Sequence, residues 1–484
     1  MTTANLPLIL LLVVFLVGCS SPPPATTALA QLPDHFQRHQ AIAEPALVPD
    51  AKASSLWMQP MIQAWIHDGM THNPSLQAAL ANLQSAHELT LAQKSSLLPN
   101  LSAGYSGQRS TLSSALSSPL QSPASPYTLH TAQVTVSYAP DVFGLNHALL
   151  YSIQAQETLA AAQYDAARLA LAGTIAATAI QLAWAEDSLH DAQNILSQSQ
   201  QLTRTIQQGL ALGFNTRSDL LQQQQQEKQF AAQIPVWEKQ KEASLDLLAV
   251  LTGQTPDHMH AQPLHLADLV HTASPVLSLP SSLVRRRPDI RAAQAQVQSA
   301  AAGLGIAVAS RWPQFSLTAA WGGSSTLLGT TLSPADRFWS LGASISQPIF
   351  DFGVLKHRQK AAQDNLQASE AQYRMTVLQA LQNVADSLYA LQTDEKSLRQ
   401  TQIQEQCAED LLRSSQHRLH AGMSSALDLL QNRISTEQSR MSLLQAQASR
   451  LQDLVALHLA LGLDFTDENG VVQVQHHNQR LDKD

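Results

Sequence analysis

The chain has 484 residues, of which 44% are hydrophobic, 14% charged and 5% aromatic, and its formal net charge is −8. The acidic balance excludes a nucleic-acid binder, which needs clustered Lys and Arg. After residue 18 no stretch comes near the 18 or so apolar residues that a membrane-spanning helix requires, which excludes a polytopic helical membrane protein. Two cysteines, Cys19 and Cys407, leave no basis for a disulfide framework.

We expect an export signal at the N-terminus. Residues 6–17 are an apolar run, too short for a confident transmembrane helix, that leads into Gly18-Cys19. A cysteine here, before a Ser/Pro-rich stretch, is similar to a bacterial lipobox, although no Lys or Arg precedes the run. We predict a signal peptide over residues 1–18 and lipid attachment at Cys19; an incidental cysteine is the alternative. In lipoproteins of this kind, Ser20 after the cysteine implies sorting to the outer membrane.

The rest of the chain contains a long internal repeat. Glycines recur at a constant spacing of 209 residues: Gly144 and Gly353, Gly213 and Gly422, Gly253 and Gly462. Prolines upstream recur at a spacing of 214 residues: Pro74 and Pro288, Pro99 and Pro313. The difference predicts a longer loop in the first half, after Pro99, because gaps accumulate in loops.

The repeat divides the chain into six predicted segments, each with its own character. These are the signal peptide over residues 1–18, a lipidated linker and equatorial segment over 19–73, the first repeat over 74–253, a crossover linker over 254–287, the second repeat over 288–462 and a polar tail over 463–484.

Both repeats begin with a short helix and a pair of strands. Proline is tolerated at a helix start, so helices are predicted over residues 75–98 and 289–311. A period-two alternation of apolar with small or polar residues then predicts strands. The predicted strands cover residues 101–108, 130–139, 315–322 and 339–349.

A long helix and a return helix complete each repeat. Apolar residues step by three and four, the heptad pattern of a coiled coil. They are Leu159, Ala162, Ala166, Leu169, Gly173, Ala176, Ile180 and Ala183, and in the second repeat Val377, Leu381, Val384, Leu388, Leu391 and Leu398. Gly213 and Gly422 are predicted to reverse the chain, and Pro235, whose counterpart is Leu444, predicts a kink in the first return helix.

The number of predicted strands indicates that several chains assemble to form one barrel. Four strands leave exposed edges, and even small closed barrels need about eight. Strands that alternate small or polar with apolar residues, in an exported lipoprotein, suit an outer-membrane barrel built from several chains. The predicted fold class is therefore mainly α with a small membrane β-barrel, and long antiparallel coiled-coil helices forming a tunnel.

Several motifs resemble those of TolC-family outer-membrane efflux lipoproteins of the NodT/OprM type. They are Asn73-Pro74-Ser75-Leu76, Arg286-Arg287-Pro288-Asp289-Ile290, Trp312-Pro313-Gln314-Phe315 and Pro348-Ile349-Phe350-Asp351-Phe352-Gly353. The resemblance implies a homotrimer in the outer membrane, in which each chain contributes four strands to a shared 12-stranded barrel above a helical periplasmic tunnel. It further implies an exit duct of a tripartite pump, docked to a periplasmic adaptor and an inner-membrane transporter.

The reversals of the long helices are the candidate periplasmic tip and gate. Asp219 and Asp428 each stand six residues after the tip glycines Gly213 and Gly422. Relatives often carry acids at +6, +9 or both, whereas the +9 residues here are glutamines, so at most one acidic ring, from Asp428, is expected. The alternative is an acid that the helix dipole stabilises at a helix N-terminus.

Other motifs favour structural roles. Asp351-Phe352-Gly353 matches a kinase motif, but the repeat favours a strand-to-helix turn. His258, His260, His265 and His476-His477 lack ligand spacing with Cys or carboxylates, so neither a metal nor any other cofactor is expected. Arg285, Arg286 and Arg287 are interpreted as solvated or paired residues at a helix start. Cys407 is expected to be a buried small hydrophobe.

Three other functions compete with efflux of small molecules. A TolC-like duct for type I protein secretion is barely separable in sequence, although the lipobox favours efflux. A pore-less periplasmic coiled-coil scaffold would need no strands. An enzyme is disfavoured because no nucleophile, base and orienting residue occur together.

Overall fold

The computed structural model describes residues 59–111, 126–259, 263–270, 287–463 and 465. Several candidate residues lie outside these ranges: Cys19, His260, Arg285, Arg286, His476 and His477.

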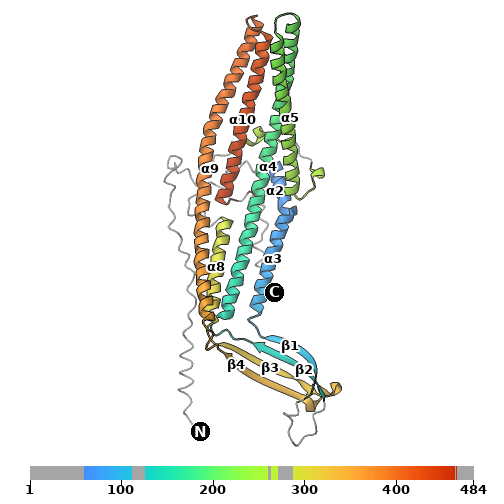
Figure 1. The fold of residues 1–484 in the computed structure, drawn as a ribbon, viewed down its shortest axis with the longest axis vertical. Coiled ribbons are helices and arrows are strands. Elements are labelled where there is room, and N and C mark those ends of the chain that lie inside the picture. Colours follow the sequence, from blue (N-terminus) through green and yellow to red (C-terminus); the bar gives the residue numbers. More distant parts are fainter. Residues whose placement is uncertain (1–58, 112–125, 260–262, 271–286, 464, 466–484) are drawn as a thin grey trace. The chain divides into compact units, whose positions relative to one another are not determined.

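The element order occurs twice along the chain (Figure 1). The first set is α3 (Pro74–Ser95), β1 (Asn100–Ser110), β2 (Tyr127–Tyr138), α4 (Leu145–Ala211) and α5 (Arg217–Leu251). The second set is α8 (Pro288–Ala309), β3 (Gln314–Ser325), β4 (Arg337–Ser346), α9 (Val354–His420) and α10 (Ala426–Leu461). The remaining elements are α2 (Pro60–His72), α6 (Leu266–Val270) and the 3-10 turns η6 (Pro256–His258), η7 (Leu328–Thr330) and η8 (Pro334–Asp336). The predicted helices and the four predicted strands are thus confirmed, and α5 runs as one helix through Pro235.

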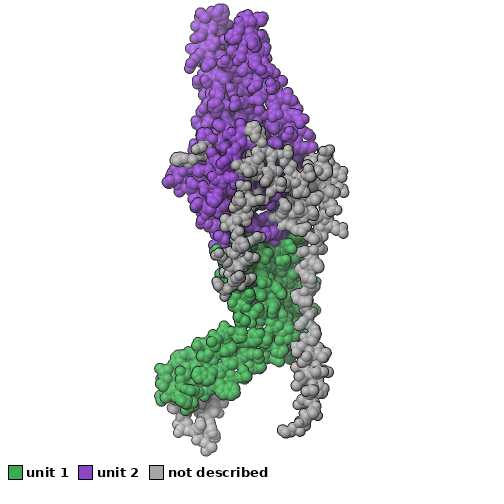
Figure 2. All heavy atoms as spheres, turned by 180° about the vertical axis from the view of Figure 1, so that it is seen from behind, with its two compact units in different colours: residues 1–29, 82–161, 292–374 green, residues 30–81, 162–291, 375–484 purple. Residues whose placement is uncertain are grey.

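The chain forms two compact units (Figure 2). The described residues of the strand unit are 82–111, 126–161 and 292–374, and those of the helical unit are 59–81, 162–259, 263–270, 287–291, 375–463 and 465. Both units draw on both repeats, because the boundaries fall inside α3, α4, α8 and α9.

The strand unit contains one antiparallel sheet in the order β1-β2-β3-β4 (Figure 1). The two predicted hairpins are joined by β2 and β3, which pair from His130 opposite Ser325 to Tyr138 opposite Leu317. β1 and β4 are the edge strands, and each has a partner on one side only among the described residues. In the same unit, His87 of α3 lies 2.8 Å from Glu157 of α4.

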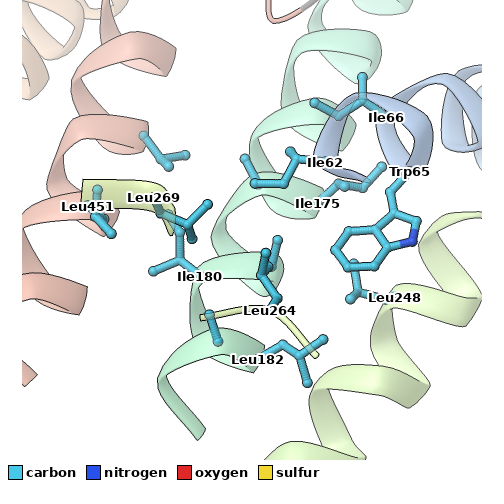
Figure 3. Packing of buried hydrophobic residues seen from close by; sticks show 14 of the residues in the cluster. Ile62, Trp65, Ile66, Ile175, Ile180, Leu182, Leu248, Leu264, Leu269 and Leu451 are labelled. Atoms are coloured by element: carbon cyan, nitrogen blue, oxygen red, sulfur yellow. The ribbon is translucent and has the colours of Figure 1, made fainter. Parts of the chain in front are cut away.

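The helical unit is organised around α4 (Figure 3). Ile175 and Ile180 of α4 are fully buried and pack with Ile62 and Ile66 of α2 and with Leu248 of α5. Most predicted heptad positions are buried: Ala162, Ala176, Ile180, Ala183, Val377, Val384, Leu388, Leu391 and Leu398. Close packing of these apolar side chains therefore holds the long helices, as the heptad pattern predicts.

Two sequence expectations are wrong. α4 contains an 18-residue window with a mean hydropathy of 1.4, long and apolar enough to cross a membrane, although 56% of that window is buried inside the structure, as in a core helix. In α4, Ala, Leu and Ile are interspersed with single Thr and Gln residues, so the mean hydropathy is high without an uninterrupted apolar run. Cys407 is exposed rather than buried, because it lies on the face of α9 that also exposes Ile403 and Leu411.

Candidate channel wall and helix tips

The sheet has two chemically different faces. Directly opposed residues of antiparallel strands share a face, and successive residues alternate between faces. The register places one set of apolar residues together: Leu101, Ala103, Val134, Val136, Leu317, Ala319, Trp321, Trp339, Leu341 and Ile345. The opposite face carries mainly small and polar residues, with Tyr127, Leu129 and Phe338 as exceptions near its loop end: Ser102, Gly104, Gln133, Thr135, Ser137, Ser316, Thr318, Ser340, Gly342 and Ser344.

The apolar face is open to its surroundings. On β4, Trp339 is 77% exposed, Leu341 78% and Ile345 66%. A continuous exposed surface of large apolar side chains marks a membrane or protein contact. Across the other face, Ser316 and Ser344 bond through their hydroxyls at 2.7 Å. One face of the sheet thus fits an apolar phase and the other fits water.

The turn that joins β4 to α9 is built by Asp351. Its carboxylate accepts the backbone N–H groups of Gly353 at 2.9 Å and Leu355 at 2.8 Å. These bonds hold the pKa of the Asp351 carboxyl below its ordinary value. The interpretation of this motif as a strand-to-helix turn is confirmed.

Both long helices end at a glycine in the left-handed conformation. Gly213 has φ +83° and Gly422 has φ +72°, values that favour glycine because a Cβ would be strained there. The N–H of Phe214 bonds to the carbonyl of Gly209, and that of Met423 to the carbonyl of Arg418, each at 2.8 Å. The two predicted reversals are therefore real and alike.

Asp219 and Asp428 close a capping box at the start of each return helix. Asp219 accepts the N–H of Thr216 at 2.8 Å, and its own N–H donates to the Thr216 hydroxyl at 3.2 Å. In the second repeat Asp428 and Ser425 exchange the same bonds at 3.2 and 3.1 Å, and the Ser424 hydroxyl adds one at 3.0 Å. The backbone bonds lower the pKa of both carboxyls. Both acids therefore stabilise a helix start, and the gate role of Asp428 stays a prediction.

A buried side chain donates a hydrogen bond to the last turn of each return helix, and we call each of these contacts a clasp. Arg287, 7% exposed, donates through Nη1 to the carbonyl of Ala460 at 2.8 Å and forms a bidentate pair with Asp289 at 3.0 and 2.6 Å. Asn73, 5% exposed, donates to the carbonyl of Leu251 at 2.9 Å. Arg287 is thus paired, as expected, but its burial and its clasp role were not predicted. The signal was the repeat itself, which aligns these two residues.

A buried carboxylate between α4 and α10 was also missed. Asp191 is 1% exposed, and its Oδ2 atom lies 3.4 Å from Nε of Arg440. Burial raises the pKa of Asp191 to about 6, which Arg440 opposes and Glu437 reinforces. No sequence motif marks it, because heptad spacing does not identify which polar positions a neighbouring helix covers.

The two crossover histidines that the structure describes are each hydrogen-bonded, His258 within its own turn and His265 to the long helix α4. Nδ1 of His265 lies 2.6 Å from Oδ1 of Asp187, and Nδ1 of His258 lies 2.6 Å from the Thr255 hydroxyl. Hydrogen bonding to Asp187 raises the pKa of His265. Within the described ranges, no three His, Cys, Asp or Glu side chains are grouped so as to hold a metal ion.

Comparison with known proteins identifies the architecture. The family model for outer membrane efflux proteins matches residues 65–254 and 279–463. The pyoverdine export outer membrane protein OpmQ of Pseudomonas putida is 28% identical over 458 residues, which cover 92% of this chain and 95% of that protein. The toluene efflux pump outer membrane protein TtgC of Pseudomonas putida is 26% identical over 468 residues, 95% of each chain.

Solved structures show the same fold. The outer-membrane channel OprN superposes with a TM-score of 0.78 at 23% identity, over 87% of this chain and 97% of that one. The open state of the MtrE outer membrane channel of Neisseria gonorrhoeae superposes with a TM-score of 0.73 at 25% identity, over 90% of this chain and 96% of that one. The likeness therefore extends over both described units.

Proposed function

The chain belongs to the outer membrane efflux protein family, and on that premise we propose that it is the exit duct of a tripartite efflux pump. It passively exports small molecules that an inner-membrane transporter delivers through a periplasmic adaptor. The family resemblance read from the sequence motifs is confirmed. The family consists of transport ducts, so we assign no catalytic residues.

The two-faced sheet carries this proposal. Its apolar face includes Trp339, Leu341 and Ile345, and Ser, Thr and Gly predominate on its other face. The edge strands β1 and β4 each have one free side among the described residues. The unpaired backbone N–H and C=O groups on those sides need strands from other chains as partners. Three copies joined edge to edge form a 12-stranded barrel with lipid outside and water inside. A pore-less scaffold would have no use for such a sheet.

Export of small molecules is favoured over protein secretion by the relatives. One is described as a pyoverdine export protein and another as a toluene efflux protein. The choice of substrate belongs to the transporter, since the polar face of the sheet carries no charged side chain that would select one.

The remaining assignments complete the proposal. Cys19 carries the lipid anchor after the signal peptide of residues 1–18 is removed. The tips at Gly213 and Gly422 face the periplasm, and Asp428 lines the gate while Asp219 lies further from the axis. The gate opens when the adaptor binds the open state more tightly. The capping box around Asp428 supports a well-ordered tip, because it gives the carboxylate one defined position.

Single-channel recording in planar bilayers tests the proposal. The purified protein should form channels, and Asp428→Ala should change conductance or cation preference more than Asp219→Ala, since three like charges around one axis attract cations. The two variants remove equivalent capping bonds and so control for loss of the cap. Equal recordings from both variants and the wild type would remove the gate assignment. Absence of any channel would refute the duct.

A further inference from the structure

The charged residues of the sheet are segregated. Among the residues of the four strands, the only Lys, Arg, His, Asp or Glu side chains are those of Arg109 on β1, His130 on β2 and Arg337 on β4. Two are arginines and the third is a histidine, and no acidic side chain stands among the strand residues. The segment of residues 112–125 that follows β1 contains no charged residue in its sequence.

The register puts these three residues on one face and at one end. Arg337 opposes Gly323, which shares the apolar face with Trp321, and His130 opposes Gly107 and Ser325. Arg109 lies two residues beyond Gly107 on the same face. That end is the loop end of the sheet, remote in sequence from the helices that precede β1 and follow β4.

Along the apolar face, the type of side chain changes from one row of directly opposed residues to the next. One row contains Leu101, Val136 and Leu341, and the next contains Trp321 opposite Trp339. The following rows contain Tyr105 with Arg337, then His130, then Arg109. Aliphatic, then aromatic, then cationic side chains are the order in which a membrane protein meets hydrocarbon, interface and charged headgroups.

The two arginines are available to a ligand, whereas Nδ1 of the partly buried His130 lies 2.7 Å from the Tyr105 hydroxyl. Arg337 and Arg109 are exposed, and the Nε of Arg337 is held by the carbonyl of Leu332 at 3.2 Å. The Nη groups of Arg337, and the guanidinium of Arg109, make no hydrogen bond to a described residue. Asp336, the residue before Arg337, accepts the Ser333 hydroxyl at 2.9 Å. A planar guanidinium matches a phosphate bidentately.

We propose that Arg109, His130 and Arg337 form a basic rim that binds the phosphate groups of a lipid in the outer leaflet of the outer membrane. The inference rests on the proposed duct, which turns this face to lipid and this end outwards. The edge strands β1 and β4 carry the two arginines, so joining copies edge to edge distributes the cations around the whole barrel. Charge complementarity selects a phosphate-bearing lipid over a neutral one, and the adjoining aromatic row selects lipid over a soluble anion.

Native mass spectrometry of the full chain in detergent tests the rim, with a diphosphorylated glycolipid and its dephosphorylated form as probes. The wild type should retain the phosphorylated lipid preferentially. The double variant Arg109→Gln/Arg337→Gln should bind it about 30-fold more weakly, the effect of two arginines near anionic headgroups. Arg358→Gln, an exposed arginine of α9 outside the sheet, is the matched control and should bind as the wild type does.

A competition measurement distinguishes a lipid site from a soluble-anion site. Inorganic phosphate at millimolar concentration should not displace the lipid; displacement would identify a soluble-anion site and overturn the proposal. Equal binding of both glycolipids by the wild type, or undiminished binding by the double variant, would also overturn it. Channel recordings on the same preparations distinguish the two failures, because a conducting variant with unchanged lipid binding refutes the rim alone, whereas a wild type that forms no channel refutes the duct.

Discussion

Replacing Arg287 with methionine should release the end of α10 while leaving most of the helical unit folded. The substitution keeps a long apolar stem but removes the donor to the carbonyl of Ala460 and both bonds to Asp289. A buried carbonyl left without a donor costs roughly 1–3 kcal/mol. Asp289 is 44% exposed and regains water, so its lost partner adds little. We expect a loss of about 2 kcal/mol of unfolding free energy.

The repeat supplies a paired experiment. Asn73→Ala removes the donor to the carbonyl of Leu251 and the side-chain oxygen that accepts the N–H groups of Ser75 and Leu76. A lost N-cap adds about 1 kcal/mol to the lost buried bond. Each variant should therefore loosen its own return helix, α5 for Asn73→Ala and α10 for Arg287→Met.

Hydrogen exchange measured by mass spectrometry reads the two helix ends separately. Exchange should accelerate in the last turn of α10 for Arg287→Met and in the last turn of α5 for Asn73→Ala. Arg291→Met is the control, since its pair with Asp165 at 2.7 Å is 42% and 35% exposed and should contribute less than about 1 kcal/mol. Unchanged exchange at the end of α10 in Arg287→Met, or the same change in the control, would refute the clasp.

Three other outcomes follow from the described contacts and the N-terminal sequence. Ser425→Ala should lower the stability of the second helix reversal by about 1 kcal/mol through loss of its cap, seen as faster exchange at the start of α10 but not of α5. Burial raises the pKa of Asp191 to about 6 from 3.8, so between these values the folded state holds a proton that the unfolded state has lost, and stability should fall as the pH rises through this window. Asp191→Asn should flatten that decline in thermal unfolding and raise the melting temperature at pH 7.5; an unaltered pH profile would contradict the burial argument. Cys19→Ser should abolish incorporation of radiolabelled fatty acid, and persistent labelling would exclude the lipobox.

The repeat made the order of elements predictable. Glycines at a constant spacing marked the same turns twice, so Gly213 and Gly422 predicted both helix reversals before any contact was known. Alternation over short segments likewise predicted the strands, because a period of two matches the geometry of a strand and not that of a helix. The pairing of β2 with β3 was less accessible, since it joins residues nearly two hundred positions apart.

Side-chain roles at the tips and helix ends needed the structure. The spacing Thr216-x-x-Asp219 and Ser425-x-x-Asp428 is a capping-box signature, which the sequence displays and which explains why an acid stands at the same place in both repeats. Arg287 lies in a recognisable motif, yet its burial depends on the end of α10, which is 173 residues away. Cys407 shows the opposite error, because average burial statistics cannot identify which face of α9 stays uncovered.

The capping boxes also bear on the order in which a newly exported chain folds. Each reversal has its own stop and start signals, and bonds such as Thr203 to Glu227 and Asn432 to Ser415 join residues 24 and 17 positions apart. The β2–β3 ladder closes a loop of nearly two hundred residues, and such contacts form slowly. The helical hairpins should therefore form first, as pulse-labelled hydrogen exchange during refolding can show. The apolar strands then pair on a chain whose helical hairpins have already folded. Early folding of the helices thus shortens the time during which the exposed strands can aggregate.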